Sequence, residues 1–184
     1  GEGRSNYHIG MDSATKIMTW NNTNAQADSA ADWNSTAPTA SIVNVGTNAR
    51  TNKDDIDYVM YCWRPVDGFS NFGKYTGNAN VNGPYIYLGF KPSWLMVKRV
   101  DSANDWQIFD AGRNDRNPVD LRLYADLSNA EAEGSSTDIF DFLSNGFKVR
   151  EDNAAINASG GTYIYMAFAE NPFVGDGTNP TTAR

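Results

Sequence analysis

Residues 157–173 read NASGGTYIYMAFAENPF, and this stretch decides the fold. A polar turn with two glycines opens it, an apolar and aromatic run follows, and Pro172 ends it. Such an arrangement is typical of a buried β-strand entered from a tight turn. We therefore predict a strand over residues 162–169, with one face in a core.

The same pattern occurs 105 residues earlier, where residues 52–65 read NKDDIDYVMYCWRP. A second strand is therefore expected over residues 56–63, and the two strands are expected to superpose in two related units. Two aligned positions are aromatic in both stretches, and the four residues there are expected to be buried: Tyr58, Trp63, Tyr163 and Phe168.

The repeat predicts an all-β chain of two related β-sandwich-like units, the first of which lacks its opening strands. With 184 residues, the chain is long enough for two units of about 100 residues each. The expected division is a partial first repeat unit over residues 1–66, a complete second unit over residues 67–173 and a polar tail over residues 174–184. A sheet without its first strands has open edges, so we expect another chain or upstream residues to cover them.

Further short strands are expected where β-rich runs lie between turn residues. The turn around Asn145-Gly146 separates two apolar runs, which is the strongest short hairpin signal. Residues 64–84 carry four glycines with aromatic residues between them, which favours a structured crossing over a flexible linker. The additional expected strands are residues 7–9, 16–20, 40–45, 85–90, 94–99, 106–110, 121–125, 139–143 and 147–149.

Composition narrows the function classes. A net charge of −7 without a cluster of Lys and Arg makes nucleic acid a poor partner. No apolar run approaches the ~18 residues of a membrane span, so membrane insertion is not expected. A single cysteine, Cys62, excludes an intrachain disulfide framework. Because Cys62 aligns with Ala167, we expect it to be a small buried residue.

No catalytic residue, metal site or cofactor is predicted. His8 is the only histidine and is expected to be structural. The carboxylates are spread along the chain, and none forms a pair that stands out from ordinary turn-capping acids as a glycosidase would need. Calcium at these turns is a minority alternative. The carboxylates considered are Asp54, Asp55, Asp57, Asp138, Asp141, Glu151 and Asp152.

Ligand-binding residues are not identified by the sequence. Trp20, Trp33 and Trp106 would be candidates for stacking on a sugar if they were exposed, although core positions are favoured for each.

Four segments are distinctive when taken together: KYTGNANVNGPYIYLGFKPSWLMVKR at residues 74–99, DWQIFDAGRN at 105–114, DFLSNGFKVR at 141–150, and the stretch at 157–173. Together they resemble a repeated domain of tailed-phage virion proteins. That family is formally of unknown function and is similar to a cyanophage baseplate plug component. One departure is Arg64-Pro65, which stands where the second copy has Ala169-Glu170.

The resemblance implies a non-enzymatic virion structural protein, most simply a tail or baseplate component such as a plug or fibre. It would act through multimeric assembly with its own copies and other virion proteins, in the virion or otherwise outside the cell. The alternative is a carbohydrate-binding or host-receptor module, with a host surface glycan as partner, and exposed Trp and Tyr rings beside a loop would favour it. A further alternative is a self-assembling extracellular or capsid-surface protein that uses strand complementation.

Overall fold

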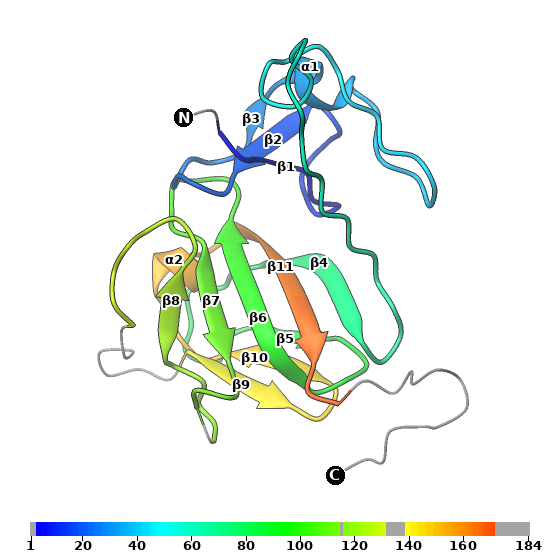
Figure 1. The fold of residues 1–184 in the computed structure, drawn as a ribbon. Coiled ribbons are helices and arrows are strands. Elements are labelled where there is room, and N and C mark those ends of the chain that lie inside the picture. The colour runs from blue at the N-terminus through cyan, green and yellow to red at the C-terminus, as the bar shows by residue number, and fades with distance from the viewer. Residues whose placement is uncertain (1–2, 115, 132–138, 172–184) are drawn as a thin grey trace, which may run out of the picture.

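The computed structural model describes residues 3–114, 116–131 and 139–171 (Figure 1). The prediction of an all-β fold is confirmed, with 32% strand, 5% helix and three antiparallel sheets. The predicted tail at residues 174–184 and the carboxylate of Asp138 lie outside the described residues.

Two of the sheets face each other around one core (Figure 1). The larger sheet has the strand order β4-β11-β6-β7-β8, and the smaller has the order β5-β10-β9. The strands of the larger sheet are β4 (Ser70–Thr76), β6 (Pro92–Arg99), β7 (Gln107–Asp110), β8 (Arg122–Tyr124) and β11 (Thr162–Ala169). Those of the smaller sheet are β5 (Tyr85–Tyr87), β9 (Phe140–Leu143) and β10 (Gly146–Val149). The short helix α2 (Ala154–Asn157) precedes β11.

β11 has the bounds that the sequence predicts, and it lies between β4 and β6 in the larger sheet. Its side chains alternate between two apolar clusters, as strand geometry requires. Tyr163 and Tyr165 enter the core between the two sheets, whereas Ile164 and Met166 enter a second cluster on the opposite face. The strand is therefore buried on both sides.

Aromatic rings fill the core between the sheets. Tyr75 of β4 stacks on Tyr163 of β11 with ring centroids 4.9 Å apart, and Phe140 meets Phe147 edge-on at 5.5 Å. The predicted hairpin at Asn145-Gly146 is confirmed, since β9 and β10 pair with Leu143 opposite Gly146. A Cβ on Gly146 would lie 2.0 Å from the Ile86 carbonyl oxygen, so only glycine allows β5 to approach here.

The other face of the larger sheet is covered by the start of the chain, drawn in blue in Figure 1. We call residues 5–33 the N-terminal layer. It contains β1 (Ser5–Asn6), β2 (Lys16–Thr19), β3 (Ala27–Asp28) and α1 (Ala30–Trp33), and its three strands form one small sheet in the order β1-β2-β3. Met11 and Met18 of this layer pack with Met96, Ile164 and Met166 of the larger sheet, so the two parts share one cluster.

Polar contacts also join the layer to the sheet. The Trp106 Nε1–H donates to the Thr19 carbonyl oxygen at 3.0 Å. Lys98, only 1% exposed, donates from Nζ to the Thr23 carbonyl oxygen at 3.2 Å, and its burial lowers the pKa of the amine to about 8. These buried donors fix the layer at defined points of the larger sheet.

His8 is held between the layer and β11. Its Nδ1 accepts a hydrogen bond from the Gly10 amide at 2.9 Å, so the ring proton is on Nε2, which donates to the Tyr165 carbonyl oxygen at 3.0 Å. Burial lowers the pKa of His8 to about 4 from its ordinary value of 6.5, against the opposing effect of the bond to Tyr165. The structural role predicted for this histidine is the one that the structure gives it.

The strand predicted over residues 56–63 is wrong. These residues are extended but pair with no strand, and all eight are exposed. Tyr58 is 43% and Trp63 is 53% exposed, and Cys62 is exposed as well, so the burial predicted for these three side chains is also wrong. β11 is buried because β4 and β6 flank it and a layer covers each face, whereas within the described ranges no strand flanks residues 56–63 and no layer covers them.

The expected superposition of the two strands therefore fails. Of the aromatic residues predicted as core, Tyr163 is fully buried, and Phe168 is partly buried against Trp94 and Phe72.

Smaller differences concern the remaining strands. No strand forms at residues 7–9 or 40–45, and the predicted strand at 16–20 appears as β2. The sequence missed β4, which lies in the glycine-rich crossing over residues 64–84 and pairs along its length with β11. The division of the chain at residue 66 stays a prediction.

We expect His8 to make the protein less stable in mild acid. Because its pKa is lower in the folded state, the unfolded chain binds more protons between about pH 4 and pH 6.5. The stabilisation is therefore complete above about pH 6.5 and is lost as the pH falls towards 4. Urea unfolding of the wild type and His8→Gln at about pH 4.5 and pH 7.5 measures this. The variant should show a smaller change between the two pH values, and an equal change would contradict the prediction.

Cys62 should behave as a surface residue. We expect a maleimide or iodoacetamide reagent to modify it in the folded protein at nearly the rate found in urea, because the side chain is exposed. Cys62→Ser should change the free energy of unfolding by less than about 0.5 kcal/mol. Strong protection of the thiol in the native state would show that residues 56–63 are covered.

Candidate functional site

The carboxylates considered from the sequence do not come together. Asp54 and Asp55 are exposed just before residues 56–63, Asp57 is exposed within them, and Asp152 is exposed elsewhere. Asp141 contacts Arg150 with an oxygen–nitrogen distance of 3.5 Å, and Glu151 is buried with 8% exposure. Among the residues that the structure describes, no group of three His, Cys, Asp or Glu side chains is arranged to hold a metal ion.

The tryptophans considered for sugar stacking are structural. Trp33 is 7% exposed and Trp106 only 2%. Trp20 is partly buried because its ring stacks on that of Trp106, with centroids 5.1 Å apart and planes 9° apart. All three rings belong to the contact between the N-terminal layer and the sheet or to the layer itself. Trp33 and Trp106 are buried, and one face of the Trp20 ring lies on Trp106.

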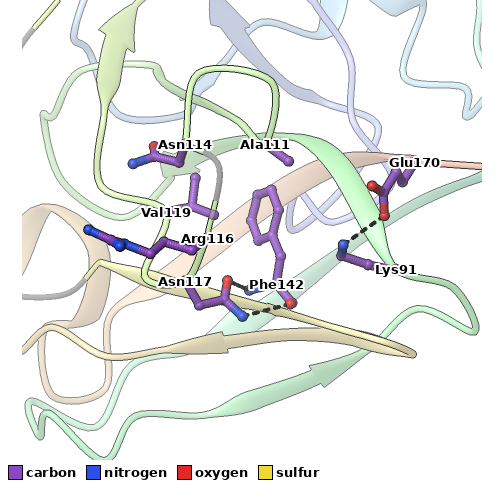
Figure 2. Close-up of a pocket in the computed structure, with 8 residues that line it drawn as sticks. All are labelled: Lys91, Ala111, Asn114, Arg116, Asn117, Val119, Phe142 and Glu170. Carbon is purple, nitrogen blue, oxygen red and sulfur yellow. Dashed lines mark hydrogen bonds and ion pairs between the residues drawn. The ribbon is translucent and has the colours of Figure 1, made fainter. Parts of the chain in front are cut away.

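Figure 2 shows a pocket of about 250 Å³ beside β9. The Asn117 amide donates to the Phe142 carbonyl oxygen at 2.9 Å and accepts from the Phe142 amide at 2.8 Å, so this side chain pairs with β9 as a strand would. Lys91 and Glu170 form an ion pair at 2.7 Å. The lining residues are Lys91, Ala111, Asn114, Arg116, Asn117, Val119, Phe142 and Glu170. Most of the polar groups are bonded within the protein, and Asn117 and Val119 pair with β9 at the edge of the smaller sheet.

The most unusual surface is the stretch that the repeat misassigned. We call residues 56–63 the exposed segment; it is part of the teal trace that runs from the N-terminal layer down to β4 in Figure 1. Six of its large apolar side chains are open to solvent: Ile56 (52%), Tyr58 (43%), Val59 (80%), Met60 (50%), Tyr61 (75%) and Trp63 (53%). Tyr61 and Trp63 stack on each other with centroids 6.0 Å apart.

The backbone of the exposed segment is unpaired as well. No backbone-to-backbone hydrogen bond joins residues 54–65 to any other residue in the described part of the chain. Extended backbone with unpaired N–H and C=O groups is a template for pairing with another strand. The exposed segment therefore combines strand-forming side chains with backbone groups that have no backbone partner among the described residues.

The upper end of the segment is tied to the N-terminal layer. Asp32 is fully buried and accepts hydrogen bonds from Arg50 at 3.0 Å and from Asn48 at 3.2 Å, which fixes residues 48–50. The Tyr58 hydroxyl then donates to the Ala49 carbonyl oxygen. These contacts hold the start of the segment on the layer. Neither Asp32 nor its role was identified from the sequence.

The lower end is tied to β4. The backbones of Val66 and Ser70 exchange two hydrogen bonds, at 3.0 and 2.9 Å, across a three-residue turn that contains Gly68 with a φ of 71°. The Ser70 hydroxyl donates to the Arg64 carbonyl oxygen at 2.9 Å. The segment is therefore anchored at both ends, and between these anchors its backbone pairs with no other residue in the described part of the chain.

One signal in the sequence could have identified this segment. The residue of β11's unit that aligns with Pro65 is Glu170, whose amide donates to the Lys91 carbonyl oxygen at 3.0 Å. Proline has no N–H and cannot make this bond. The departure at Arg64-Pro65 therefore indicates that residues 56–63, although similar in sequence to β11, lack the backbone bond that follows the end of β11.

The comparisons with known proteins give a family but no function. Neither the curated proteins nor the solved structures include a match to this chain. No helix in the described ranges has the length and apolar character needed to cross a membrane. Residues 2–172 match the family described as a domain of unknown function, DUF7483. Since this match covers nearly the whole chain, the protein belongs to the DUF7483 family.

Proposed function

We propose that the chain is a non-enzymatic structural protein of a tailed-phage particle, in the tail or baseplate, that works by assembling with its own copies and with other virion proteins. The resemblance of four segments to a virion domain supports the setting. The exposed segment supports the mode of action, and it is the observation on which the proposal depends.

The magnitude of the exposure argues for a partner. Fully burying a large apolar side chain is worth about 1.5–3 kcal/mol, and the segment exposes six of them within eight residues. Pairing of its backbone would add hydrogen bonds of about 0.5–1.5 kcal/mol each. Such surfaces mark interaction sites in soluble proteins. A protein that acts by shape and burial needs a surface of this kind and needs no catalytic group.

The second candidate function is recognition of a carbohydrate or host receptor. It is favoured by one observation, the stacked and exposed rings of Tyr61 and Trp63. These are exposed Trp and Tyr rings beside a loop, which is the arrangement that a sugar-binding surface uses. Saturable glycan binding that is lost in Trp63→Ala, with self-association unchanged, would promote this candidate over the first.

The setting is tested on phage particles that carry this sequence. We expect mass spectrometry of purified particles to find the chain in a fixed copy number, and gold-labelled antibody to mark the tail or baseplate. Particles that lack the chain, with the protein found only in the cell lysate, would overturn the proposal.

The mode of action is tested by a charge in the exposed segment. Val59→Lys should weaken self-association, because a charged side chain on an open strand blocks pairing. The change should leave the free energy of unfolding within about 0.5 kcal/mol of the wild type, since Val59 is 80% exposed. Sedimentation velocity over a range of concentrations measures the association. The matched control is Ile42→Lys, which adds the same charge at a side chain that is 57% exposed in another loop. Equal association in the two variants would count against the segment.

A further inference from the structure

β4 is an edge strand with an open side. It is the first strand in the order of the larger sheet, so only β11 pairs along its length. Ser70 turns its amide and carbonyl outward, to Val66. Because these groups alternate along a strand, those of Phe72, Lys74 and Thr76 also point outward. No backbone hydrogen bond in the described part of the chain uses them on that side.

The turn between Val66 and Ser70 defines which residues would face this edge. Continuing the antiparallel register of that pair places Arg64 opposite Phe72, Cys62 opposite Lys74 and Met60 opposite Thr76. In this register the nitrogen of Pro65 points away from β4, where a missing N–H does no harm. The outward backbone groups of β4 and those of residues 60, 62 and 64 therefore match in number and direction, and the Arg64 carbonyl oxygen already accepts from the Ser70 hydroxyl.

The side chains match as well. The same register places Trp63 opposite Gly73, where the Tyr165 ring already covers the missing side chain, its hydroxyl oxygen 2.6 Å from the position of an ideal Cβ. It places Tyr61 opposite Tyr75, which stacks on Tyr163 at 4.9 Å. An added strand would thus extend the Tyr75–Tyr163 stack by one ring and bring a second ring next to Tyr165. β4 already pairs on its inner side with β11, whose sequence the exposed segment repeats.

We propose that residues 60–64 of one chain add as a sixth strand to the open edge of β4, at Phe72–Thr76, in a second copy of this chain. Within one chain the segment is bonded at Tyr58 to Ala49, whose neighbours Asn48 and Arg50 bond to Asp32 of the N-terminal layer. No backbone bond in the described part of the chain joins residues 60–64 to β4, although the connecting turn is already formed. Each copy therefore carries both an unpaired strand and an unpaired edge that fits it. A short hinge beside such a strand is the usual setting for exchange between copies.

This inference rests on the proposed function only in requiring self-association. Exchange in both directions between two copies gives a closed dimer, whereas exchange in one direction gives a chain of subunits. Either outcome is the strand complementation that a virion component could use, and neither depends on where in a particle the chain is located.

The test mixes two single-cysteine chains. One is the native chain with Cys62, and the other carries Cys62→Ser with Lys74→Cys. A disulfide between the two chains can only be intermolecular, and mild oxidation should give several-fold more of it than the same mixture with a control chain that carries Cys62→Ser and Val81→Cys. Val81 is 53% exposed and lies outside β4, in the loop that follows it. Equal yields would overturn the proposal. So would rapid internal closure of a chain that carries Lys74→Cys with native Cys62, because that shows the segment on its own β4.

A second measurement needs no substitution. Hydrogen exchange of the native chain should show protection of the Phe72, Lys74 and Thr76 amides that increases with protein concentration, while the amides of Asn71, Gly73 and Tyr75, which face β11, stay protected throughout. If the outward amides are protected to the same extent at all concentrations, the segment pairs with β4 of its own chain, which contradicts strand exchange between copies. Absence of protection at every concentration contradicts it as well. If strand exchange between copies were found but the protein were absent from phage particles, this inference would stand and only the proposed setting would be removed.

Discussion

β11 carries apolar side chains on both of its faces, and the rest of the structure follows from the need to cover both faces. Tyr163, Tyr165 and Ala167 face the smaller sheet, while Ile164 and Met166 face the other way. A sandwich of two sheets covers one face only. Leaving Ile164 and Met166 in water would forgo about 1.5–3 kcal/mol for each. The N-terminal layer is therefore a necessary third layer, and Met11, Met18 and the Trp20–Trp106 stack are its attachment.

The exposed segment shows what the same kind of sequence does without such cover. Its aromatic and β-branched residues repeat those of β11, yet they lie in solvent, because strand propensity takes effect only where a neighbouring strand and a packed face are supplied. Asp32 and its partners hold the segment at one end, and the Val66–Ser70 pair holds it at the other. The segment and the open edge of β4 are thus two halves of one contact, and the chain keeps them apart. This is the physical link between the fold and the proposed assembly.

The sequence predicted strands that carry a strong local pattern and failed where the presence of a partner strand decides the outcome. The hairpin at Asn145-Gly146 and the strand over residues 162–169 carry their own local signals, and both are present. β4 was missed because Gly73 weakens its strand signal, although that glycine is what admits the Tyr165 ring. The exposed segment was assigned to a core because side-chain pattern says nothing of whether a flanking strand exists. Pro65, which has no N–H, was the local sign that residues 56–63 differ from β11. The exposed segment, which is the candidate site, could have been identified from this sign.

The claim that one chain covers both faces of β11 as a single unit is tested most directly by hydrogen exchange at increasing urea concentration. The amides of β2, in the N-terminal layer, and those of β11 are followed in the same samples. If the layer is part of the unit, β2 and β11 become exposed in one cooperative step with the same free energy and the same dependence on urea. If β2 opens at a clearly lower free energy while β11 keeps its full protection, the larger sheet does not need its third layer and the claim is contradicted.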